Sequence, residues 1–536
     1  MGQIPALKRR SLLVAAGLLA AGCERKRELQ GGFKGVAVER AHLLRELPGM
    51  QGEPIGHRTR VLVAGAGVAG LSAARALHMQ GVEDFAVLDL EDQAGGNARG
   101  GEIAGIAHPL GAHYLPVPGD DAHEVQNLLE EMGLRQRQAG RWVYDERALC
   151  HSPQERLHFG GKWQDGLLPV AGVTEQTLAQ YRQFSQLVHA WRRTGAFRMP
   201  MRWDDAAYKA WLRLSMPFGI WLDGQGLNDP HLRWYLGYCC RDEYGDGLDR
   251  VTAWAGIHYF ASRHGFNAPG QAEEGRDQVL TWPQGNAFLT SHMARPLGDR
   301  LRTGMLVTRI SESAAGVEVL ALDVARQQWH RWQCEACVLA MPVHVARRVV
   351  DGAPDWLGIA ATQIRQASWV VANVHIDAPL RDRGADVDGA APAWDNVIYG
   401  SSGLGYVDAR HQTTNPLPGP TVLTWYAALG SQPKARAQLL QAPWSDLAAQ
   451  ALGEMAAAHP DIHQRATRVD ITRCGHAMAV PTPDTLRMVI DLQRRFEGGV
   501  LRTKRMAMAH SDWSGYSVFE EAFTRGLHAA QAMAKV

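Results

Sequence analysis

The feature that most constrains the fold is a glycine pattern that follows a short apolar run, residues 61–64. Gly65, Gly67 and Gly70 lead directly into a helix-forming segment, residues 71–80. Gly65 permits a tight turn, Gly67 lets the backbone approach a pyrophosphate, and Gly70 lets the helix pack on the strand. The N–H groups and the dipole at the start of such a helix favour anionic phosphates. The pattern therefore predicts a strand–turn–helix unit that holds a phosphate-bearing ligand.

A second apolar strand, residues 85–88, ends at Asp89, whose carboxylate can accept hydrogen bonds from a ribose diol. Strand, glycine turn, helix, second strand and acid all fall at the spacing of a dinucleotide-binding unit. We therefore expect a dinucleotide to lie on the turn, against the backbone of Val68 and Ala69 at the start of the helix. The spacing alone does not distinguish FAD from NAD.

The next segment does distinguish them. The stretch "VLDLEDQAGGN", residues 87–97, resembles the "VLEARDRVGGR" stretch of FAD-dependent amine oxidases and their phytoene-desaturase-like relatives. The resemblance implies that Gly95 and Gly96 pass close to the flavin nucleotide. Two positions depart from the family pattern: Glu91 replaces an arginine beside the adenine, and Asn97 replaces an arginine that faces a phosphate. We expect Arg99 to supply the missing charge.

The carboxyl-terminal end resembles the closing FAD motif of the same family. In "MAHSDWSGYSVFEEAFTRGLHAAQAM", residues 508–533, Asp512 matches the acid that bonds the ribityl or pyrophosphate region. The "WSGY" within it is similar to a stretch of monoamine oxidases, and the final helix would direct its amino end at the flavin. A middle segment from Thr281 implies a backbone contact from Val307 to the adenine side. "LGAHYLP", residues 110–116, resembles the family's approach to the flavin.

These segments predict an α/β fold with a Rossmann-like FAD-binding domain of the amine-oxidase type, discontinuous in sequence. We expect this domain over 58–120, 276–350 and 495–536. A second domain, with a mixed sheet and helices, would bind the substrate over 121–275 and 351–494. Helical patterns at 121–134, 175–193 and 444–458, and strand-like runs at 368–376 and 421–429, support this division.

Candidate catalytic residues come from the expected substrate domain. The family usually places a lysine near the flavin, but the matching strand, residues 366–376, contains none and offers Trp369 or Val370. His476 lies among small residues and could act as an acid or base near neutral pH, or bond to backbone in a loop. Trp425 and Tyr426 fall where the family lines its substrate cavity with aromatic rings. His113 and Tyr114 would face the flavin.

The composition of the chain bears on which kinds of partner it can bind. The chain has 56 Lys and Arg against 55 Asp and Glu, a net charge of +1, which gives no reason to expect nucleic acid. Cys334 and Cys337 have the spacing of a metal or redox pair, but no second pair or nearby histidine supports a ligand set, and they lead into an apparent buried strand. We predict no metal site.

The amino terminus resembles an export signal. Arg9 and Arg10 precede a run of about a dozen apolar residues, too short for a helix that spans a bilayer, which needs about 20. The pair resembles a twin-arginine signal, which exports folded proteins, and residues 19–23 resemble a lipobox that ends at Cys23. We expect residues 1–23 to be the signal, Cys23 to be lipidated, and residues 24–57 to be a tether with one short helix. The alternative is an ordinary signal or an uncleaved anchor.

The resemblance implies an FAD-dependent oxidoreductase, lipid-anchored on the periplasmic side of a bacterial envelope, that removes a hydride from a small molecule. An amine or polyamine is the first expected substrate, with oxygen or an envelope electron acceptor as oxidant. The absent lysine leaves a desaturase-like or other non-amine flavin dehydrogenase open, and a flavin-binding lipoprotein without turnover stays open too. Because FAD would lie between opposite chain ends, it can bind only after folding, which agrees with export of folded cargo.

Overall fold

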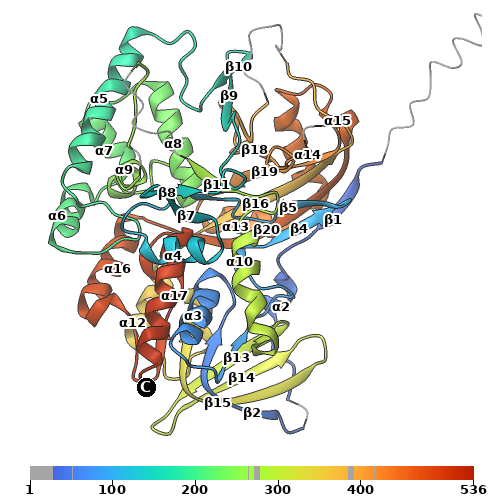
Figure 1. The fold of residues 1–536 in the computed structure, drawn as a ribbon, viewed down its shortest axis with the longest axis vertical. Coiled ribbons are helices and arrows are strands. Elements are labelled where there is room, and N and C mark those ends of the chain that lie inside the picture. The colour runs from blue at the N-terminus through green and yellow to red at the C-terminus, as the bar shows by residue number, and fades with distance from the viewer. Residues whose placement is uncertain (1–27, 51, 264, 271–277, 384–391, 416) are drawn as a thin grey trace, which may run out of the picture.

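The computed structural model describes residues 28–50, 52–263, 265–270, 278–383, 392–415 and 417–536. These residues form two mixed α/β domains, each built around its own large sheet (Figure 1). Within the described ranges, no helix has both the length and the apolar character needed to cross a bilayer. The predicted signal and Cys23 lie outside the described residues.

The sheet of the nucleotide-binding domain has the strand order β12-β3-β2-β15-β14-β13, with β21 paired to β15. The strands β12, β3, β2, β15 and β21 are parallel, and β14 and β13 form an antiparallel extension. Their bounds are β2 Ile55–Ala64, β3 Phe85–Leu88, β12 Leu301–Arg302, β13 Met305–Glu312, β14 Val317–Asp323, β15 Gln328–Leu339 and β21 Met506–Met508. One sheet thus unites three distant parts of the chain.

Helices cover both faces of this sheet. One face packs against α3 (Val68–Met79), α4 (His123–Glu131), α10 (Ala287–Ala294) and α17 (Phe519–Met533). The other face packs against α11 (Val343–Val349), α12 (Asp355–Gln363) and α16 (Pro483–Arg495). The helices α3 and α17 approach closely, because a Cβ at Gly526 would lie 2.0 Å from the carbonyl oxygen of Ala69. The first and last helices of the core are therefore in direct contact.

The domain boundary expected at residue 121 differs in the structure. The apolar face of α4, with Val125, Leu128 and Leu129, lies in the nucleotide-binding core beside α17. Leu134 and Ala148 join the same core. The segment 123–149 therefore packs with the nucleotide-binding domain, because the apolar face of α4 is buried there.

The substrate domain contains an eight-stranded sheet of order β1-β20-β16-β19-β18-β17-β9-β10. Its inner face packs against helices α5 to α9, and its outer face packs against α13 and α14. The strands are β1 Gln30–Phe33, β9 Glu155–Phe159, β10 Lys162–Asp165, β16 Arg365–Ile376, β17 Asp395–Ile398, β18 Tyr406–Asp408, β19 Thr421–Ala428 and β20 Ala466–Val480. The helices are α5 Glu175–Arg192, α6 Asp205–Leu214, α7 Phe218–Gly224, α8 Pro230–Tyr244, α9 Ala253–Ala261, α13 Pro433–Gln441, α14 Trp444–Ala456 and α15 Ile462–Arg465.

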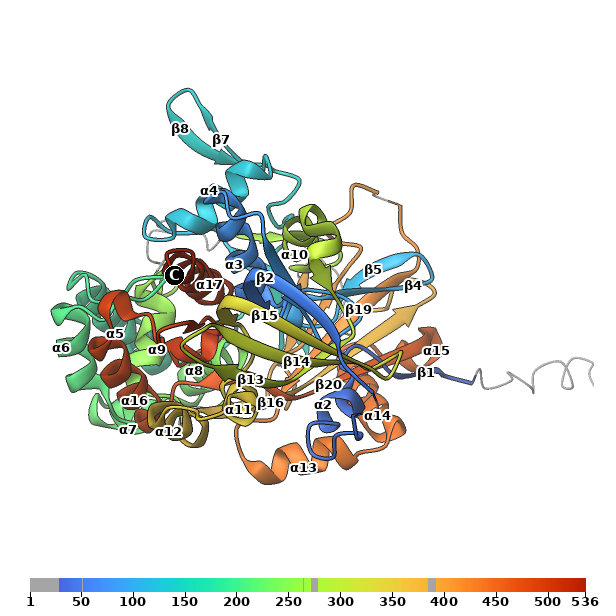
Figure 2. The ribbon, with the colours of Figure 1, turned by 90° about the horizontal axis from the view of Figure 1, so that it is seen from below.

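Smaller elements complete the fold. Three two-stranded sheets pair β4 (Gly100–Ile103) with β5 (Ile106–Pro109), β6 (Tyr114–Pro116) with β11 (Val279–Thr281), and β7 (Arg135–Gln138) with β8 (Arg141–Tyr144). Figure 2 shows the β7–β8 hairpin standing out from the body. Short 3₁₀ turns are η1 Gly96–Ala98, η2 Arg295–Arg300, η3 Glu497–Gly499 and η4 Ser511–Ser514.

Residues 28–46, here called the amino-terminal arm, do not hang free. The strand β1 pairs in parallel with β20, and α2 (Val38–His42) follows it. Gly31 fits because its φ is +141° and a Cβ there would lie 1.8 Å from the carbonyl oxygen of Val469. Arg348 Nε donates to the carbonyl oxygen of Leu44 at 2.9 Å. The expected tether does contain one short helix, but its described part is fastened to both domains by these contacts.

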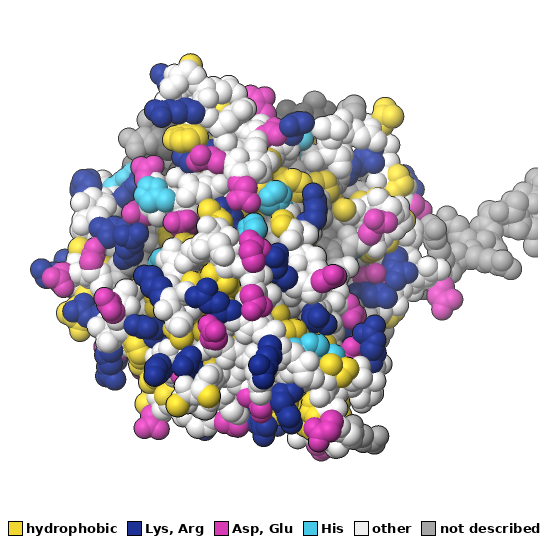
Figure 3. Space-filling view, turned by 60° about the horizontal axis from the view of Figure 1, so that its bottom comes forward, with side chains coloured by type: hydrophobic (Ala, Val, Ile, Leu, Met, Phe, Trp, Pro, Cys, Tyr) yellow, Lys and Arg dark blue, Asp and Glu magenta, His cyan; other side chains and the backbone are white. Residues whose placement is uncertain are grey.

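The surface carries no dominant sign of charge on the face that Figure 3 shows. Lys and Arg side chains are interspersed there with Asp and Glu side chains. This mixture agrees with the net charge of +1. The described surface in that view lacks the continuous basic stripe with which proteins hold nucleic acid.

Candidate functional site

The glycine turn between β2 and α3 has the geometry that a bound pyrophosphate requires. Gly65 has a φ of +110°, and a Cβ at Gly70 would lie 1.8 Å from the carbonyl oxygen of Gly65. Gly67 is the residue before α3, in extended conformation, so the first N–H groups of the helix, from Val68 onward, point toward the turn. Side chains at these positions would fill the space in which a phosphate meets the backbone.

A second loop completes this cradle. Gly95 N donates to the carbonyl oxygen of Ala66 at 2.8 Å, and Gly95 and Gly96 have φ values of +124° and +58°. A Cβ at Gly96 would lie 3.0 Å from Gly67 Cα. The two loops therefore meet backbone to backbone. A dinucleotide fits this cradle, since the glycines keep its floor clear of side chains.

Asp89 lies at the end of β3, where the sequence placed it. Its Oδ2 accepts from Ala66 N at 2.6 Å, and its Oδ1 accepts from Glu91 N at 2.9 Å. Burial raises the pKa of Asp89, although these two hydrogen bonds oppose the shift. A carboxylate oxygen has further lone pairs, so Asp89 can also accept from a ribose diol.

Glu91 and Arg99, two of the unusual positions, form an ion pair of 3.1 Å. Glu91 also accepts from Ala37 N at 3.1 Å, and Arg99 donates to the carbonyl oxygens of Gly96 and Gly35 at 2.9 and 3.0 Å. The charge of Arg99 is therefore balanced by Glu91, and the pair fastens the amino-terminal arm beside the cradle.

Asn97 and Asp512 join the nucleotide-binding domain to the substrate sheet. Asn97 Nδ2 donates to the carbonyl oxygen of Ala477 on β20 at 2.6 Å. Asp512, fully buried in η4, accepts from Val343 N at 2.9 Å and from Gln366 Nε2 at 2.8 Å. Burial alone would raise the pKa of Asp512, but His510 and these hydrogen bonds hold it below the ordinary value. Both residues lie at the domain junction, where the predicted cofactor would cross.

Val307 lies on β13 at an irregularity in its pairing with β14, between Val307 and Arg309. Its side chain is buried in the core below the sheet. A break in the ladder leaves backbone groups available for a ligand. The contact of Val307 with adenine stays a prediction.

A cluster of aromatic rings surrounds His113 and Tyr114, the two residues predicted to face the flavin, on the inner face of the substrate sheet. The His113 ring stacks on Tyr426, with centroids 4.5 Å apart, and lies 5.5 Å from Trp394. Tyr114 meets Trp394 edge to face at 6.0 Å. Tyr426 Oη donates to the carbonyl oxygen of Gly111 at 3.0 Å, which ties β19 to this stretch. The structure thus brings Tyr426 together with His113 and Tyr114.

Trp425 does not belong to this cluster, so its prediction as a lining residue is wrong. Neighbouring residues of a strand point to opposite faces of the sheet. Trp425 is 1% exposed, packs in the outer layer with α14, and donates from Nε1 to Glu454 at 3.1 Å. The same alternation decides which residue of β16 takes the place of the family's lysine on the inner face. Trp369 packs against the inner core, and Val370 points outward.

Two carboxyl groups face the aromatic cluster. Asp242, on α8, accepts from Tyr114 Oη at 3.3 Å, and Asp395 lies on β17. Burial, followed by the charge of Glu243, raises the pKa of Asp242 to about 7. Burial, followed by Glu155 and Asp242, raises the pKa of Asp395 well above its usual range.

The charge of Asp242 acts on Asp395, so the two acids lie near each other. Each keeps some accessible surface even though burial dominates its pKa, a combination that points to an enclosed space rather than to bulk solvent. Burial is the main cause that raises the pKa values of the Tyr238 and Tyr426 hydroxyls, and the charges of Asp242 and Asp395 raise them further. Among the described residues, neither Asp242 nor Asp395 has a basic side chain at ion-pair distance. We call this space the acidic aromatic cavity.

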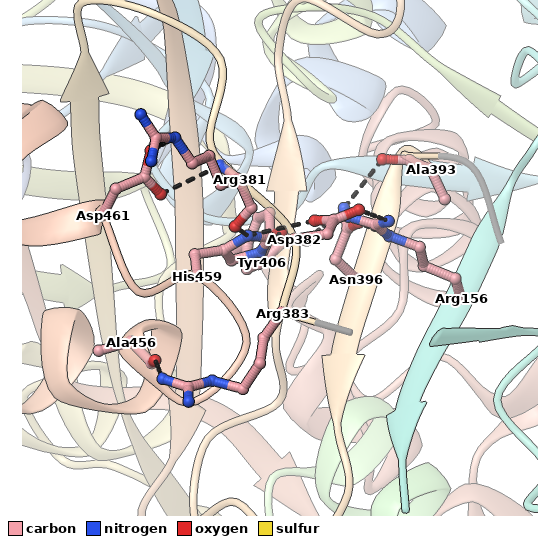
Figure 4. A network of polar contacts seen from close by, with 10 residues as sticks. All are labelled: Arg156, Arg381, Asp382, Arg383, Ala393, Asn396, Tyr406, Ala456, His459 and Asp461. Carbon is pink, nitrogen blue, oxygen red and sulfur yellow. Dashed lines mark hydrogen bonds and ion pairs between the residues drawn. The ribbon is translucent and has the colours of Figure 1, made fainter. Parts of the chain in front are cut away.

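Asn396, the neighbour of Asp395 on β17, belongs to a buried polar network (Figure 4). Arg156 Nε donates to Asn396 Oδ1 at 2.6 Å, and Arg156 Nη1 pairs with Asp382 Oδ2 at 2.6 Å. His459 lies 3.3 Å from Asp382 through Nδ1, and its Nε2 lies 2.5 Å from Tyr406 Oη. Because Asn396 and Asp395 are neighbours on one strand, fixing one amide fixes the backbone that presents the other side chain.

His476 lies apart from the acidic aromatic cavity. Its ring stacks on His344 with centroids 4.2 Å apart, its Nε2 contacts Arg436 Nη1, and the next residue, Ala477, bonds Asn97. Burial, then His344 and Arg436, lowers the pKa of His476 to about 3. The structure therefore puts this predicted acid or base on the nucleotide side, and its catalytic role has no support from these contacts.

The sequence reading missed Asp242 and Asp395. Asp242 follows an aromatic, helical stretch, "WYLGYCC", and an acid in such surroundings is a usable signal of a buried charge. Asp395 offers no comparable signal, since a single acid in "AWDNV" also suits a loop.

The fold and this site define a two-domain flavoprotein of the oxidoreductase class. The family model for flavin containing amine oxidoreductases matches residues 68–534. The chain therefore belongs to the flavin containing amine oxidoreductase family, and its cofactor is FAD.

Comparisons with individual proteins agree with this membership. A Mycobacterium tuberculosis protein, AofH, whose naming as a flavin-containing monoamine oxidase is itself provisional, is 26% identical over 296 residues. The match covers 54% of this chain and 58% of that relative, so the chain spans little more than half the length of the curated relatives it matches.

Solved structures show the same fold. Wild-type putrescine oxidase bound to putrescine has a TM-score of 0.63 at 16% identity, covering 90% of this chain and 100% of that chain. Cyclohexylamine oxidase from Brevibacterium oxydans has 0.62 at 16%, covering 89% and 99%. A fatty acid isomerase from P. acnes has 0.56 at 14%, covering 88% and 97%. At these identities the likeness shows the fold alone.

Proposed function

We propose that this protein is an FAD-dependent oxidoreductase that oxidises an amine, with a diamine or polyamine as the preferred class. The acidic aromatic cavity carries the proposal. A cationic substrate would neutralise Asp242 and Asp395, and aromatic faces such as those of Tyr426 and Trp394 attract an ammonium group. With a neutral or anionic substrate, the raised pKa values of these two acids favour their protonated, uncharged forms, and binding gains no ionic contact from them.

The residues of the cavity fit the needs of amine oxidation. Bound FAD supplies the acceptor for a hydride. An alkylammonium must lose a proton before hydride can leave its carbon, and the Asp242 carboxylate, with a pKa of about 7, can take that proton at Oδ1 or Oδ2. Loss of hydride then leaves an iminium, which water converts to a carbonyl compound and ammonium. The two electrons pass on to oxygen or to an electron acceptor of the cell envelope.

Asp395 would orient the far end of a substrate with two cationic groups. It lies on β17, whereas Asp242 lies on α8, and the network of Arg156 and Asn396 fixes its strand. His113 is neutral at physiological pH, because burial lowers its pKa to about 4, and it therefore adds no opposing charge. Amine substrates in the names of the putrescine and cyclohexylamine oxidases are consistent with this class.

An anaerobic substrate screen tests the proposal. Holoenzyme is mixed with 1,4-diaminobutane, spermidine, primary monoamines, uncharged alcohols of equal length and unsaturated fatty acids, and the flavin absorbance near 450 nm is followed. We expect one or more of the amines to bleach the flavin, and the alcohols and fatty acids to leave it oxidised. The variant Asp242→Asn should slow bleaching by an amine, and the exposed control Asp165→Asn should not.

The other outcomes each have a meaning. Bleaching by the unsaturated compounds alone would overturn the amine assignment and favour a desaturase-like dehydrogenase, the alternative that Trp369 in place of lysine keeps open. A flavin that none of these compounds bleaches would favour a flavin-binding protein without turnover.

We also propose export of the folded holoprotein by the twin-arginine route, followed by lipid attachment at Cys23. Arg9, Arg10 and the short apolar run support this proposal, as does a cofactor site built from distant chain segments. Changing Arg9 and Arg10 to Lys should retain FAD-loaded protein in the cytoplasm, measured by fractionation and flavin content. The matched control changes Arg25 and Arg27 to Lys. Undiminished export of the Arg9, Arg10 variant would contradict the proposal.

A further inference from the structure

Three basic side chains gather where the substrate sheet faces the dinucleotide cradle. Arg436 comes from α13, His476 from β20, and His344 from the first turn of α11. None of them belongs to the sequence motifs that mark the FAD site. We call them the junction cluster.

The contacts within the junction cluster are tight. The aliphatic part of the Arg436 side chain lies against Gly475 of β20. A Cβ at Gly475 would be 3.5 Å from Arg436 Cγ and Cδ. Arg436 Nη1 contacts His476 Nε2, and the His476 ring stacks on His344 at 4.2 Å. The three groups therefore form one row from the surface helix α13 to the edge of the nucleotide-binding sheet.

This row borders the cradle directly. Ala477, next to His476, accepts from Asn97 at 2.6 Å, and Asn97 follows Gly96, which meets Gly67. On the other side, a Cβ at Gly65 would lie 2.9 Å from the carbonyl oxygen of Ala340, four residues before His344. Asn97 and His476 both keep accessible surface, although the ionised form of His476 is disfavoured by its partly buried surroundings. The glycine turn, Asn97 and the junction cluster are therefore neighbours at the domain junction.

The positive charge of the junction cluster comes chiefly from Arg436. Arg436 has no carboxylate at ion-pair distance within the described part of the chain. Asp512 is the nearby acid, and its oxygens already accept from Val343 and Gln366. His344 Nδ1 is buried without a hydrogen-bond partner among the described atoms. Burial, and after it the charges of His344 and Arg436, lowers the pKa of His476, although the charge of Asp512 opposes this shift.

We infer that the junction cluster binds the pyrophosphate of FAD, with Arg436 as the main counter-charge. Phosphates of a dinucleotide meet the glycine turn and the start of α3, and Asn97 joins this region to β20 beside His476. On the cradle side, the Asn97 side chain carries no charge, and the charge of Arg99 is paired with Glu91. The positive charge that faces the pyrophosphate is therefore that of Arg436, which belongs to the substrate domain. Bound FAD would in this way contact both domains and stabilise their association.

Ligand titration of the apoprotein, prepared from holoenzyme, tests this inference. FAD binding is followed by quenching of flavin fluorescence, and ADP and riboflavin are titrated separately. In Arg436→Gln we expect the Kd for FAD and for ADP to rise about tenfold or more, as for loss of a charge-assisted contact. Riboflavin carries no phosphate, so its Kd should not change. Lys434→Gln, on the same helix and exposed, is the matched control.

A second variant protects the test against a folding defect. Asn97→Arg combined with Arg436→Gln replaces the lost positive charge with one from the nucleotide-binding domain. This double variant should restore the Kd for FAD to within a few-fold of the parent value. The salt dependence of FAD binding should weaken in Arg436→Gln and return in the double variant. Unchanged affinity for FAD and ADP in Arg436→Gln, or an equal loss for riboflavin, would overturn the inference. Neither result depends on which substrate the enzyme oxidises.

Discussion

At the scale of single residues, the burial of Asp242 lowers the free energy of unfolding at neutral and alkaline pH, where its carboxyl group must ionise. Its folded-state pKa of about 7 exceeds the ordinary value of 3.8. A carboxyl with a raised pKa holds its proton more tightly in the folded chain, so its contribution to stability is present at low pH. That contribution is lost as the pH rises toward 7. A bound ammonium would repay the loss by stabilising the charged form.

The variant Asp242→Asn should therefore be more stable than the parent at pH 8 and nearly equal to it at pH 4. The difference of about three pKa units corresponds to at most about 4 kcal/mol. Urea denaturation of both proteins at the two pH values measures it, with Asp165→Asn as the exposed control. A variant that is less stable than the parent at pH 8 would contradict the cavity assignment.

Residue positions were predictable where local backbone geometry dictates the residue type. The positive φ of Gly65 and the close approach of Gly67 to Gly96 demand glycine, so the sequence pattern revealed them. Side-chain direction was predictable only with the strand register. Trp425 and Tyr426 are equally aromatic, and alternation along β19 decides which one enters the cavity.

At the scale of elements, the regular segments of the nucleotide-binding unit were predicted closely. The predicted strand 85–88 is β3, and the predicted helix 71–80 is most of α3. Both have local signals, a short apolar run and an alanine-rich run after a glycine turn. The predicted helices 175–193 and 444–458 likewise correspond to α5 and α14.

Elements that depend on distant partners were not predicted. The strand β1 has the sequence "QGGF", which carries no strand pattern, and it exists because β20 offers an unpaired edge. The helix α4 was expected, but not its side of the domain boundary, since α17 is almost 400 residues away in sequence. Arg436, on the surface helix α13, gave no sequence signal of a site.

At the scale of the whole molecule, the cofactor cradle and the proposed substrate site are both made from segments that are distant in sequence. The cradle joins residues near 65 and 96, the closing motif follows residue 506, and the amino-terminal arm crosses beside Glu91. Closing such long loops is favourable only when the whole fold forms. The FAD site is therefore complete only in the folded chain, which is the physical basis for proposing export after folding.

The central claim is that the acidic aromatic cavity beside the flavin selects a cation. Choline and 3,3-dimethyl-1-butanol have the same shape and differ in charge, so their binding to the oxidised holoenzyme, followed by the change in flavin absorbance, measures the preference directly. We expect choline to bind at least about tenfold more tightly, as for one well-placed ionic contact. The preference should disappear in the double variant of Asp242→Asn and Asp395→Asn. Equal affinities for the two compounds in the parent protein would contradict the account.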